Sequence, residues 1–222
     1  MIKRCNLFGN ENIGVFGWSC DDYCLVGSGI EKKNRLILEE ILKVPIYEVN
    51  ISQAKIVHTL SIGNKKGILA PRTIRDDELD ILKKICGVAT RIPHELTAIG
   101  NHILCNDNGA IFNPEYNSTI RKIIEDTLDI EAVPYNILKN EPGLVGTHAI
   151  CNNKGVLIHS EADEEKLKEV SDILKVKADF GTLNLGYYPG AGGIVNSNGG
   201  VVGNETTGPE IMHLGITLGL ND

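Results

Sequence analysis

The chain has 222 residues, of which 42% are hydrophobic and 23% are charged, as in an ordinary globular protein. Its formal net charge of −7, from 22 basic and 29 acidic residues, argues against a protein that binds DNA or RNA by neutralising phosphates over its whole surface. No apolar run reaches the roughly 18 to 20 residues that span a bilayer. The N-terminal MIKRCNLF also lacks the long apolar stretch of a signal peptide, so we expect a cytoplasmic protein without a membrane partner.

One polar turn followed by apolar residues recurs at a spacing of about 44 residues, which indicates an internal repeat. Asn and Gly at fixed places in the turn suit the positive φ angles of a tight hairpin. The clear copies are NKKGIL at 64–69, NDNGAI at 106–111, NNKGVL at 152–157 and NSNGGV at 196–201. A fifth copy, with Tyr23 in the place of the glycine, precedes CLVG at 24–27. Five such units fill nearly the whole chain.

Each unit predicts the same elements in the same order: strand, hairpin turn, strand, helix, strand. The apolar runs on either side of the turn are continuous rather than alternating, which predicts short strands buried on both faces. These first runs are IGVFGW at 13–18, IVHTLSI at 56–62, AIGNHILC at 98–105, LVGTHAIC at 144–151 and AGGIVN at 191–196. We predict that the third strands lie within 45–51, 88–96, 131–138 and 176–183.

The segments that follow the hairpins have apolar residues three to four positions apart, as in Leu79, Leu82 and Ile85. This spacing predicts a helix with one face against the sheet and the other in water. Residues that suit a helix N-terminus precede the segments: Asp76, Asn117, Asp163 and Thr207, the last in a capping box with Glu210.

The fifth unit ends after its helix and has no third strand. We predict that MIKRCNLF at 1–8 supplies this strand and closes the chain into a ring, which removes sheet edges. The expected single domain has units at 9–51, 52–96, 97–140, 141–185 and 186–222. An open solenoid is the alternative, but it would need capping units with polar outer faces.

A glycine stands nine residues before the turn glycine in four of the five units, with a histidine in the other. The column is Gly14, His58, Gly100, Gly146 and Gly190. It predicts close packing of backbones near the axis of the ring, or a flat rim that a macromolecule can approach. The polar residues that follow are candidate contacts: Thr59, Asn101, His102, Thr147 and His148.

The six cysteines are predicted to be free thiols that are buried as small hydrophobic residues in apolar, strand-like runs. Cys20 and Cys24 are four residues apart, but no second pair matches them, and zinc sites need clustered thiolates or imidazoles. We therefore expect no metal and no cofactor.

The five-unit architecture resembles the pentein fold, a five-bladed α/β propeller with pseudo-fivefold symmetry, short strands inside and helices outside. Within that fold the sequence resembles the translation initiation factor 6 family in its archaeal form, without the tail of eukaryotic members. The resemblance covers the chain and is carried by NIGVFG at 12–17, YCLVG at 23–27, IGNKKGILAP at 62–71, TAIGNHILCNDNGAIFNP at 97–114, LVGTHAICNNKGVLIH at 144–159 and VVGNETTGPEI at 201–211.

This resemblance implies a protein that binds the large ribosomal subunit on its intersubunit face and sterically prevents association with the small subunit. The implied contact is mainly to ribosomal proteins, with rRNA nearby, and eukaryotic members also accompany maturation of the large subunit. It implies no catalysis, and we expect a monomer. The residues that it favours for ribosome binding are Gly14, Thr59, Asn64, Asn101, His102, Thr147 and His148. Thr59 departs from the eukaryotic members, which carry a basic residue there.

The C-terminal end of the sequence is acidic, because no Lys or Arg follows Lys177. Asp179, Glu205, Glu210 and Asp222 all lie in this end, which predicts either a solubilising surface or a patch for a basic protein partner. Glu205 is the possible acidic contact, whereas Glu210 also fits the capping box.

Two other functions are open at this point. Some penteins are enzymes that act on guanidino substrates with a cysteine nucleophile close to the C-terminus, but the last cysteine here is Cys151. A direct rRNA-binding module is the second alternative, with Lys32-Lys33 and Lys65-Lys66 as basic spots. A steep salt dependence of binding would favour it.

Overall fold

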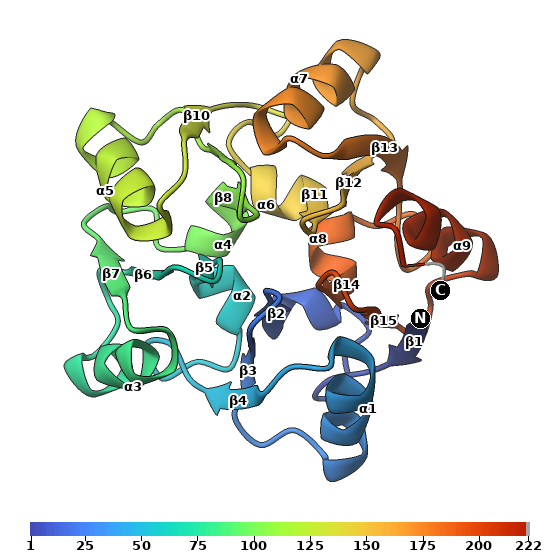
Figure 1. Ribbon diagram of the computed structural model, residues 1–222, viewed down its shortest axis with the longest axis horizontal. Coiled ribbons are helices and arrows are strands. Elements are labelled where there is room, and N and C mark those ends of the chain that lie inside the picture. The colour runs from blue at the N-terminus through green and yellow to red at the C-terminus, as the bar shows by residue number, and fades with distance from the viewer. Residues whose placement is uncertain (221–222) are drawn as a thin grey trace.

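The computed structural model describes residues 1–220 and shows a ring of five blades around a central axis (Figure 1). The five sheets have three short strands each, and five long helices lie around the circumference. The protein is therefore an α/β pentein, and the predicted fold class is confirmed. Asp222, counted above among the acidic residues, lies outside the described residues. No helix within 1–220 has the length and apolar character needed to cross a bilayer.

Every blade has a short helical turn, three strands and a long helix. Blade one has η1 (Ile13–Val15), β2 (Gly17–Ser19), β3 (Cys24–Gly27), α1 (Lys32–Leu42) and β4 (Ile46–Val49). Blade two has α2 (Val57–Leu60), β5 (Ile62–Gly63), β6 (Ile68–Pro71), α3 (Asp76–Cys86) and β7 (Ala89–Ile92). Blade three has α4 (Ile99–His102), β8 (Ile103–Cys105), β9 (Ala110–Phe112), α5 (Ser118–Leu128) and β10 (Ala132–Pro134). Blade four has α6 (Val145–His148), β11 (Ala149–Cys151), β12 (Gly155–His159), α7 (Glu164–Leu174) and β13 (Lys177–Gly181). Blade five has α8 (Pro189–Gly192), β14 (Gly193–Val195), β15 (Gly200–Gly203), α9 (Gly208–Thr217) and, from the N-terminus, β1 (Ile2–Cys5).

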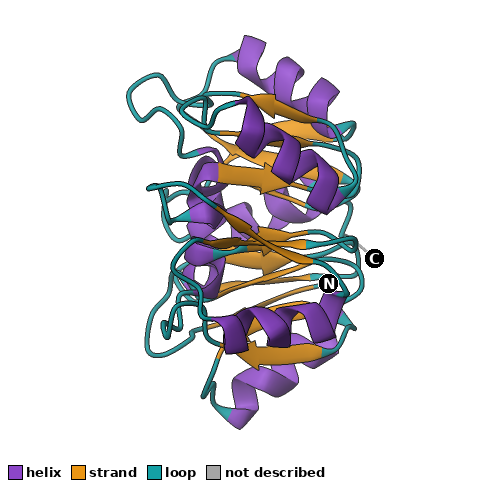
Figure 2. Ribbon diagram, turned by 90° about the vertical axis from the view of Figure 1, so that its left-hand side faces the viewer, coloured by secondary structure: helices purple, strands orange, loops and turns teal. Residues whose placement is uncertain are grey.

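The strand directions give the ring two different faces. In each blade the first two strands are antiparallel and the third is parallel to the second. In blades one to four the long helix connects the second strand to the third, whereas in blade five the third strand is the N-terminal β1. One face, here called the helical-turn face, carries η1, α2, α4, α6 and α8. The other, here called the hairpin face, carries the turns at 20–23, 64–67, 106–109, 152–155 and 196–199. In Figure 2 the short helical turns lie toward the left of the ring and both termini toward the right.

The first half of each first apolar run forms a helical turn, so the prediction of a strand over that half was wrong. Tight packing around the axis explains the difference, because successive turns touch through the glycine column. A Cβ atom on Gly100 would clash with the carbonyl of His58, and one on Gly146 would clash with the carbonyl of Gly100. The same clash links Gly190 to Gly146 and Gly14 to Gly190. The predicted close approach near the axis is therefore confirmed, and the turns form a closed inner ring (Figure 1).

The N-terminal strand closes the ring, as predicted. β1 pairs in parallel with β15, from Ile2 opposite Gly200 to Cys5 opposite Gly203, and completes the fifth sheet. The N-terminal amine also donates a hydrogen bond of 2.8 Å to the Leu220 carbonyl. The two ends of the described chain therefore meet at one seam.

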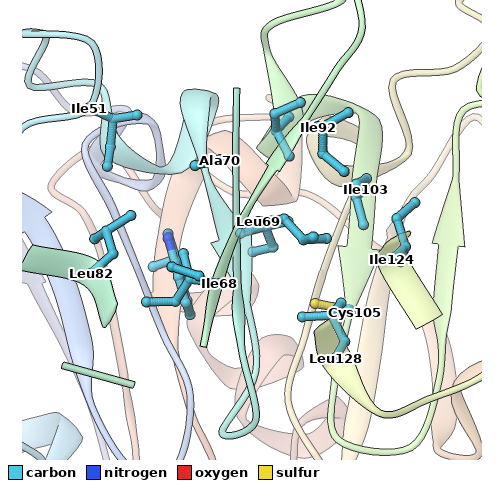
Figure 3. Packing of buried hydrophobic residues seen from close by; sticks show 14 of the residues in the cluster. Ile51, Ile68, Leu69, Ala70, Leu82, Ile92, Ile103, Cys105, Ile124 and Leu128 are labelled. Atoms are coloured by element: carbon cyan, nitrogen blue, oxygen red, sulfur yellow. The ribbon is translucent and has the colours of Figure 1, made fainter. Parts of the chain in front are cut away.

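The hydrophobic core lies between the long helices and the sheets of adjacent blades. Figure 3 shows Ile68 and Leu69 of β6 between Leu82 of α3 and Ile124 of α5, all of them almost fully buried. Asn117, Asp163 and Thr207 precede and cap their helices as predicted, and the Asn117 side chain accepts a 3.1 Å hydrogen bond from the Ile120 amide. Asp76 is instead the first residue of α3, which Arg75 precedes. All six cysteines are free thiols, but Cys20, Cys86 and Cys151 are only partly buried, so the predicted burial holds for Cys5, Cys24 and Cys105 alone. Cys86 also ends α3, so its placement in a strand-like run was wrong.

Candidate functional site

The centre of the helical-turn face holds a cavity of about 100 Å³, here called the axial mouth. It is lined by Val15, His58, Thr59, Asn101, Gly146, Thr147, Gly190 and Ala191. Three sequence-predicted candidates, Thr59, Asn101 and Thr147, therefore lie together, each in the turn of a different blade. Their side chains are half-buried and have no hydrogen-bond partner within residues 1–220. They are thus available to a molecule that approaches this face.

His58 is a residue of the axial mouth that the sequence did not single out as a candidate. Its Nδ1 atom lies 2.7 Å from the carbonyl oxygen of Gly14, which can only accept, so Nδ1 carries the proton. Burial lowers the pKa of His58 to about 4, although this hydrogen bond opposes the shift, so the imidazole is neutral at pH 7. The signal in the sequence that could have identified His58 is its position in the glycine column, where the other four units have glycine. Gly14 itself is buried beneath this contact.

His102 and His148 do not reach the axial mouth, although they follow Asn101 and Thr147 directly. His148 has no exposed surface and His102 only 9%. The Nδ1 atom of His102 lies 2.9 Å from the Gly143 carbonyl, and Nε2 of His148 lies 3.1 Å from a carboxylate oxygen of Glu141. Both therefore turn away from the axis, toward the loop at 135–144. Burial lowers the pKa of His148, with the Glu141 hydrogen bond opposing it.

Asn64 lies on the hairpin face, so the structure does not bring it together with the other candidates. Its side chain is 1% exposed and donates hydrogen bonds of 3.3 and 2.9 Å to the carbonyls of Asn106 and Leu128 in the next blade. Three equivalent side chains bridge to the following blade in the same way: Asn106, Asn152 and Asn196. The repeated Asn is a tie between blades. Asn at the same turn position in four of the five units was the signal in the sequence, and it indicated a structural role.

The helical-turn face of blade five is acidic and apolar at once. Glu205 follows β15 and is exposed, whereas Glu210 accepts hydrogen bonds from the amides of Leu185 and Gly186 and is part of the fold. Leu185 and Tyr187, in the loop before α8, are 66% and 57% exposed. Sequence reasoning missed these two apolar residues, because they lie between the strand predicted within 176–183 and the apolar run at 191–196, in a segment to which no role was assigned.

The thiols near the axis are not arranged for nucleophilic chemistry. Cys20, Cys105 and Cys151 line a cavity of about 20 Å³ on the hairpin face, which has room for roughly one water molecule. Burial raises the pKa of Cys20 and of Cys151 to about 12, so both stay protonated and are poor nucleophiles at pH 7. Within residues 1–220, no three His, Cys, Asp or Glu side chains are grouped to hold a metal ion.

Among solved structures, the chain is similar to the N-terminal domain of ArgZ, a cyanobacterial arginine dihydrolase, with 9% identity and a TM-score of 0.48 over 76% of this chain and 67% of that one. It is also similar to the agmatine deiminase of C. jejuni, with 10% identity and a TM-score of 0.43 over 71% of this chain and 60% of that one. Likenesses this distant carry no information about activity.

Sequence relatives are much closer. The chain is 38% identical over 237 residues to translation initiation factor 6 of Pyrococcus abyssi, covering 99% of both proteins. It is 41% identical over 226 residues to translation initiation factor 6 of Aeropyrum pernix, covering 98% of this chain and 95% of that protein. A model of the eIF-6 family matches residues 2–216. A match of this extent, together with full-length relatives above 30% identity, shows that the chain belongs to the eIF-6 family.

Proposed function

We propose that the protein binds the intersubunit face of the large ribosomal subunit through its helical-turn face and thereby prevents the small subunit from joining. It would act in the cytoplasm, as a monomer, in translation initiation and in large-subunit maturation. Membership of a family of translation initiation factors gives the setting. The observation that carries the proposal is the axial mouth, where Thr59, Asn101 and Thr147 converge without partners inside the protein.

The mechanism needs a rigid surface and no chemistry. The five helical turns touch one another around the axis, so the polar groups of the mouth are held in place before a partner arrives. Preorganised groups lose little entropy on binding, which favours affinity. Bound there, the ring would occupy the surface that the small subunit needs. The protonated thiols on the hairpin face do not favour the alternative of an enzyme acting on guanidino substrates.

The contact is proposed to be mainly with a basic ribosomal protein. Glu205 is exposed on the helical-turn face of blade five, and Leu185 and Tyr187 offer apolar anchors on the same face. Exposed aromatic and aliphatic side chains typically supply the binding energy of an interface, while charge complementarity speeds association and sets orientation. No Lys or Arg lines the axial mouth, which disfavours a phosphate-binding rRNA module at that point.

Sedimentation of purified ribosomal subunits on sucrose gradients, with and without the protein, tests this proposal. We expect the protein to travel with the large subunit and to shift joined subunits toward free ones. Absence of the protein from the large-subunit peak would disprove the proposal, and a steep loss of binding with salt would favour the rRNA module instead.

The variant Asn101→Asp tests the axial mouth within the same assay. We expect binding to fall by about tenfold, because a charged carboxylate replaces an amide and loses its donor group. Asn108→Asp is the matched control, since Asn108 lies in a turn of the hairpin face. Equal binding by both variants would show that the contact lies elsewhere on the ring. Unchanged thermal unfolding would show that neither variant disturbs the fold.

A further inference from the structure

The loops that lead into the helical turns are held in place by a repeated device in three of the blades. The third residue of the long helix reaches back to the loop. In α3, the carboxylate of Glu78 accepts hydrogen bonds of 2.8 and 2.7 Å from the amides of Ser52 and Gln53. Glu210 of α9 holds the loop at 183–187 in the same way. Asn34 of α1 donates a 2.7 Å hydrogen bond to the carbonyl of Asn6.

The loop at 135–144, between β10 and α6, lacks this device. The third residue of α7 is Lys166, which has no acceptor atom, and its ammonium lies over the ring of Tyr135 instead. One ion pair joins the loop to the start of α7: the Lys139 ammonium lies 3.3 Å from the carboxylate of Asp163. Both side chains are well exposed, at 81% and 45%, and such pairs contribute little. Ile137 and Leu138 bury the start of the loop in the hydrophobic core, but residues 139–142 have no buried side chain, so this half of the loop needs another anchor.

Glu141 supplies that anchor from within the loop; its own side chain is 42% exposed, but its partner His148 is fully buried. One carboxylate oxygen lies 3.1 Å from Nε2 of the buried His148, and the other accepts a 2.8 Å hydrogen bond from the hydroxyl of Tyr188 in the next blade. The other nitrogen of His148 is buried without a partner, so this imidazole depends on Glu141 for its hydrogen bonding. His102 bonds to Gly143 at the end of the same loop. Both candidate histidines therefore hold one loop.

Other ionisable groups face this cluster without replacing Glu141. The ring of His159 packs against Tyr188 with 4.8 Å between ring centres. Glu161 follows two residues later, and its own amide, not its carboxylate, contacts His159. Glu161 is exposed and near enough to influence His148 electrostatically. Substitution of Glu161 is thus a suitable control, because it removes one negative charge near His148 but leaves the hydrogen bonds of Glu141 in place.

We propose that Glu141 is a positioning residue: it fixes the loop at 135–144 on the helical-turn face, and the fixed loop supports binding by the axial mouth. The loop runs directly into α6, whose Thr147 lines the mouth, so displacement of the loop displaces a contact residue. The fixing of the loop is a property of the free protein. The effect on binding rests on the proposed function.

Amide hydrogen exchange of the free protein tests the anchor. In Glu141→Ala, we expect the Gly143 amide, which donates a 2.7 Å hydrogen bond to the side chain of Asn136 within the loop, to exchange about tenfold faster or more, since two hydrogen bonds to a charged group are lost. Glu141→Gln should restore much of the protection, because its amide oxygen can accept from His148 and its amide nitrogen can donate to Tyr188. Glu161→Ala, the matched control, should leave this loop unchanged. The loops at 51–54 and 183–187 should keep their exchange rates in every variant.

Exchange of the Gly143 amide at the wild-type rate in Glu141→Ala, or equal acceleration in Glu161→Ala, would overturn the proposal. Binding to large subunits tests its second half: Glu141→Ala should bind several-fold more weakly, with Glu141→Gln between it and the wild type. A mobile loop with wild-type binding would show that the loop does not support the contact. If the wild-type protein itself fails to bind, the proposed function fails, while the exchange result still decides whether Glu141 holds the loop.

Discussion

At the scale of single residues, similar side chains have opposite roles according to the face they occupy. Asn64 and Asn101 are both turn residues that follow glycine. Asn64 is buried and ties two blades together, whereas Asn101 lines the axial mouth with a free side chain. Buried polar groups are nearly always hydrogen-bonded, so an accessible and unpartnered amide is the more informative of the two for function. The hydrogen bonds of each side chain therefore distinguish structural residues from candidate contact residues, which residue type alone does not do.

The inner glycines allow a test of the axial packing. Gly146→Ala should lower the free energy of unfolding by roughly 1 to 3 kcal/mol or more, because its Cβ has no space beside the Gly100 carbonyl. Gly208→Ala, at the start of α9 with open space around it, should be neutral or stabilising by less than about 1 kcal/mol. Urea unfolding of both variants measures the difference. Similar values for the two would contradict the close packing at Gly146.

His58 should make stability depend on pH. Its folded-state pKa is about 4, below the ordinary value of 6.5, so the unfolded chain binds the proton first. Stability is therefore fully present above about pH 6.5 and falls as the pH drops toward 4, by on the order of 2 to 3 kcal/mol. His58→Gly, which copies the other four blades, should have a shallower dependence in urea unfolding between about pH 7 and pH 4. The same slope in both proteins would assign the dependence to other groups.

At the scale of elements, the beginning of the long helix in three blades, α1, α3 and α9, holds the loop that connects its blade to the preceding one. In α9, Thr207 and Glu210 form the capping box, and Glu210 also accepts two amide hydrogen bonds from the loop at 183–187. A local signal in the sequence, the capping box, thus takes part in tertiary structure. The same carboxylate completes the helix end and fixes the loop that exposes Leu185.

Removal of this carboxylate should loosen both elements. Glu210→Ala is expected to lower the free energy of unfolding by roughly 2 kcal/mol and to speed amide exchange at 184–187, because the helix cap and two amide hydrogen bonds lose their acceptor. Glu205→Ala is the matched control on the same surface and should stay within about 0.5 kcal/mol of the wild type. Chemical unfolding and amide exchange measure both effects, and an equal response of the two variants would refute the role of Glu210.

At the scale of the whole molecule, the ring is closed by contacts that join every blade to the next. The helical turns touch around the axis, the Asn side chains bridge the hairpins, and β1 joins the N-terminus to blade five. No blade has its own core, since the main hydrophobic clusters are shared between adjacent blades. We propose that the chain is a single domain that folds as one unit.

This proposal predicts one cooperative unfolding transition. Trp18, the only tryptophan, is buried in blade one and hydrogen-bonded to Ser61 of blade two, so its fluorescence reports on that part of the ring. Far-UV circular dichroism reports on all five blades. The two signals should change at the same urea concentration, as expected for a two-state transition. Separate midpoints would indicate that blades unfold independently and would argue against a single domain.

The sequence by itself determined the repeat, the number of units, the long helices and the closing strand, because each is a local or periodic pattern. Hydrophobic spacing, capping residues and turn residues act over a few positions, and comparison of the units within one chain revealed the register. The sequence also placed Thr59, Asn101 and Thr147 on one face, since equivalent positions in a ring must lie on the same face.

Only the tertiary structure decided which residues of these columns are free to bind a partner. Side-chain direction depends on contacts between blades, and these are made by residues far apart in the chain. Residues that the sequence predicts to be strands form helical turns, because the glycine column packs closely around the axis. In these turns His102 and His148 point away from the axis, toward Gly143 and Glu141. Asn64 lies on the opposite face because β5 runs from α2 across the ring to the hairpin turn that contains Asn64. Local patterns specify the elements, whereas packing between them specifies the surface.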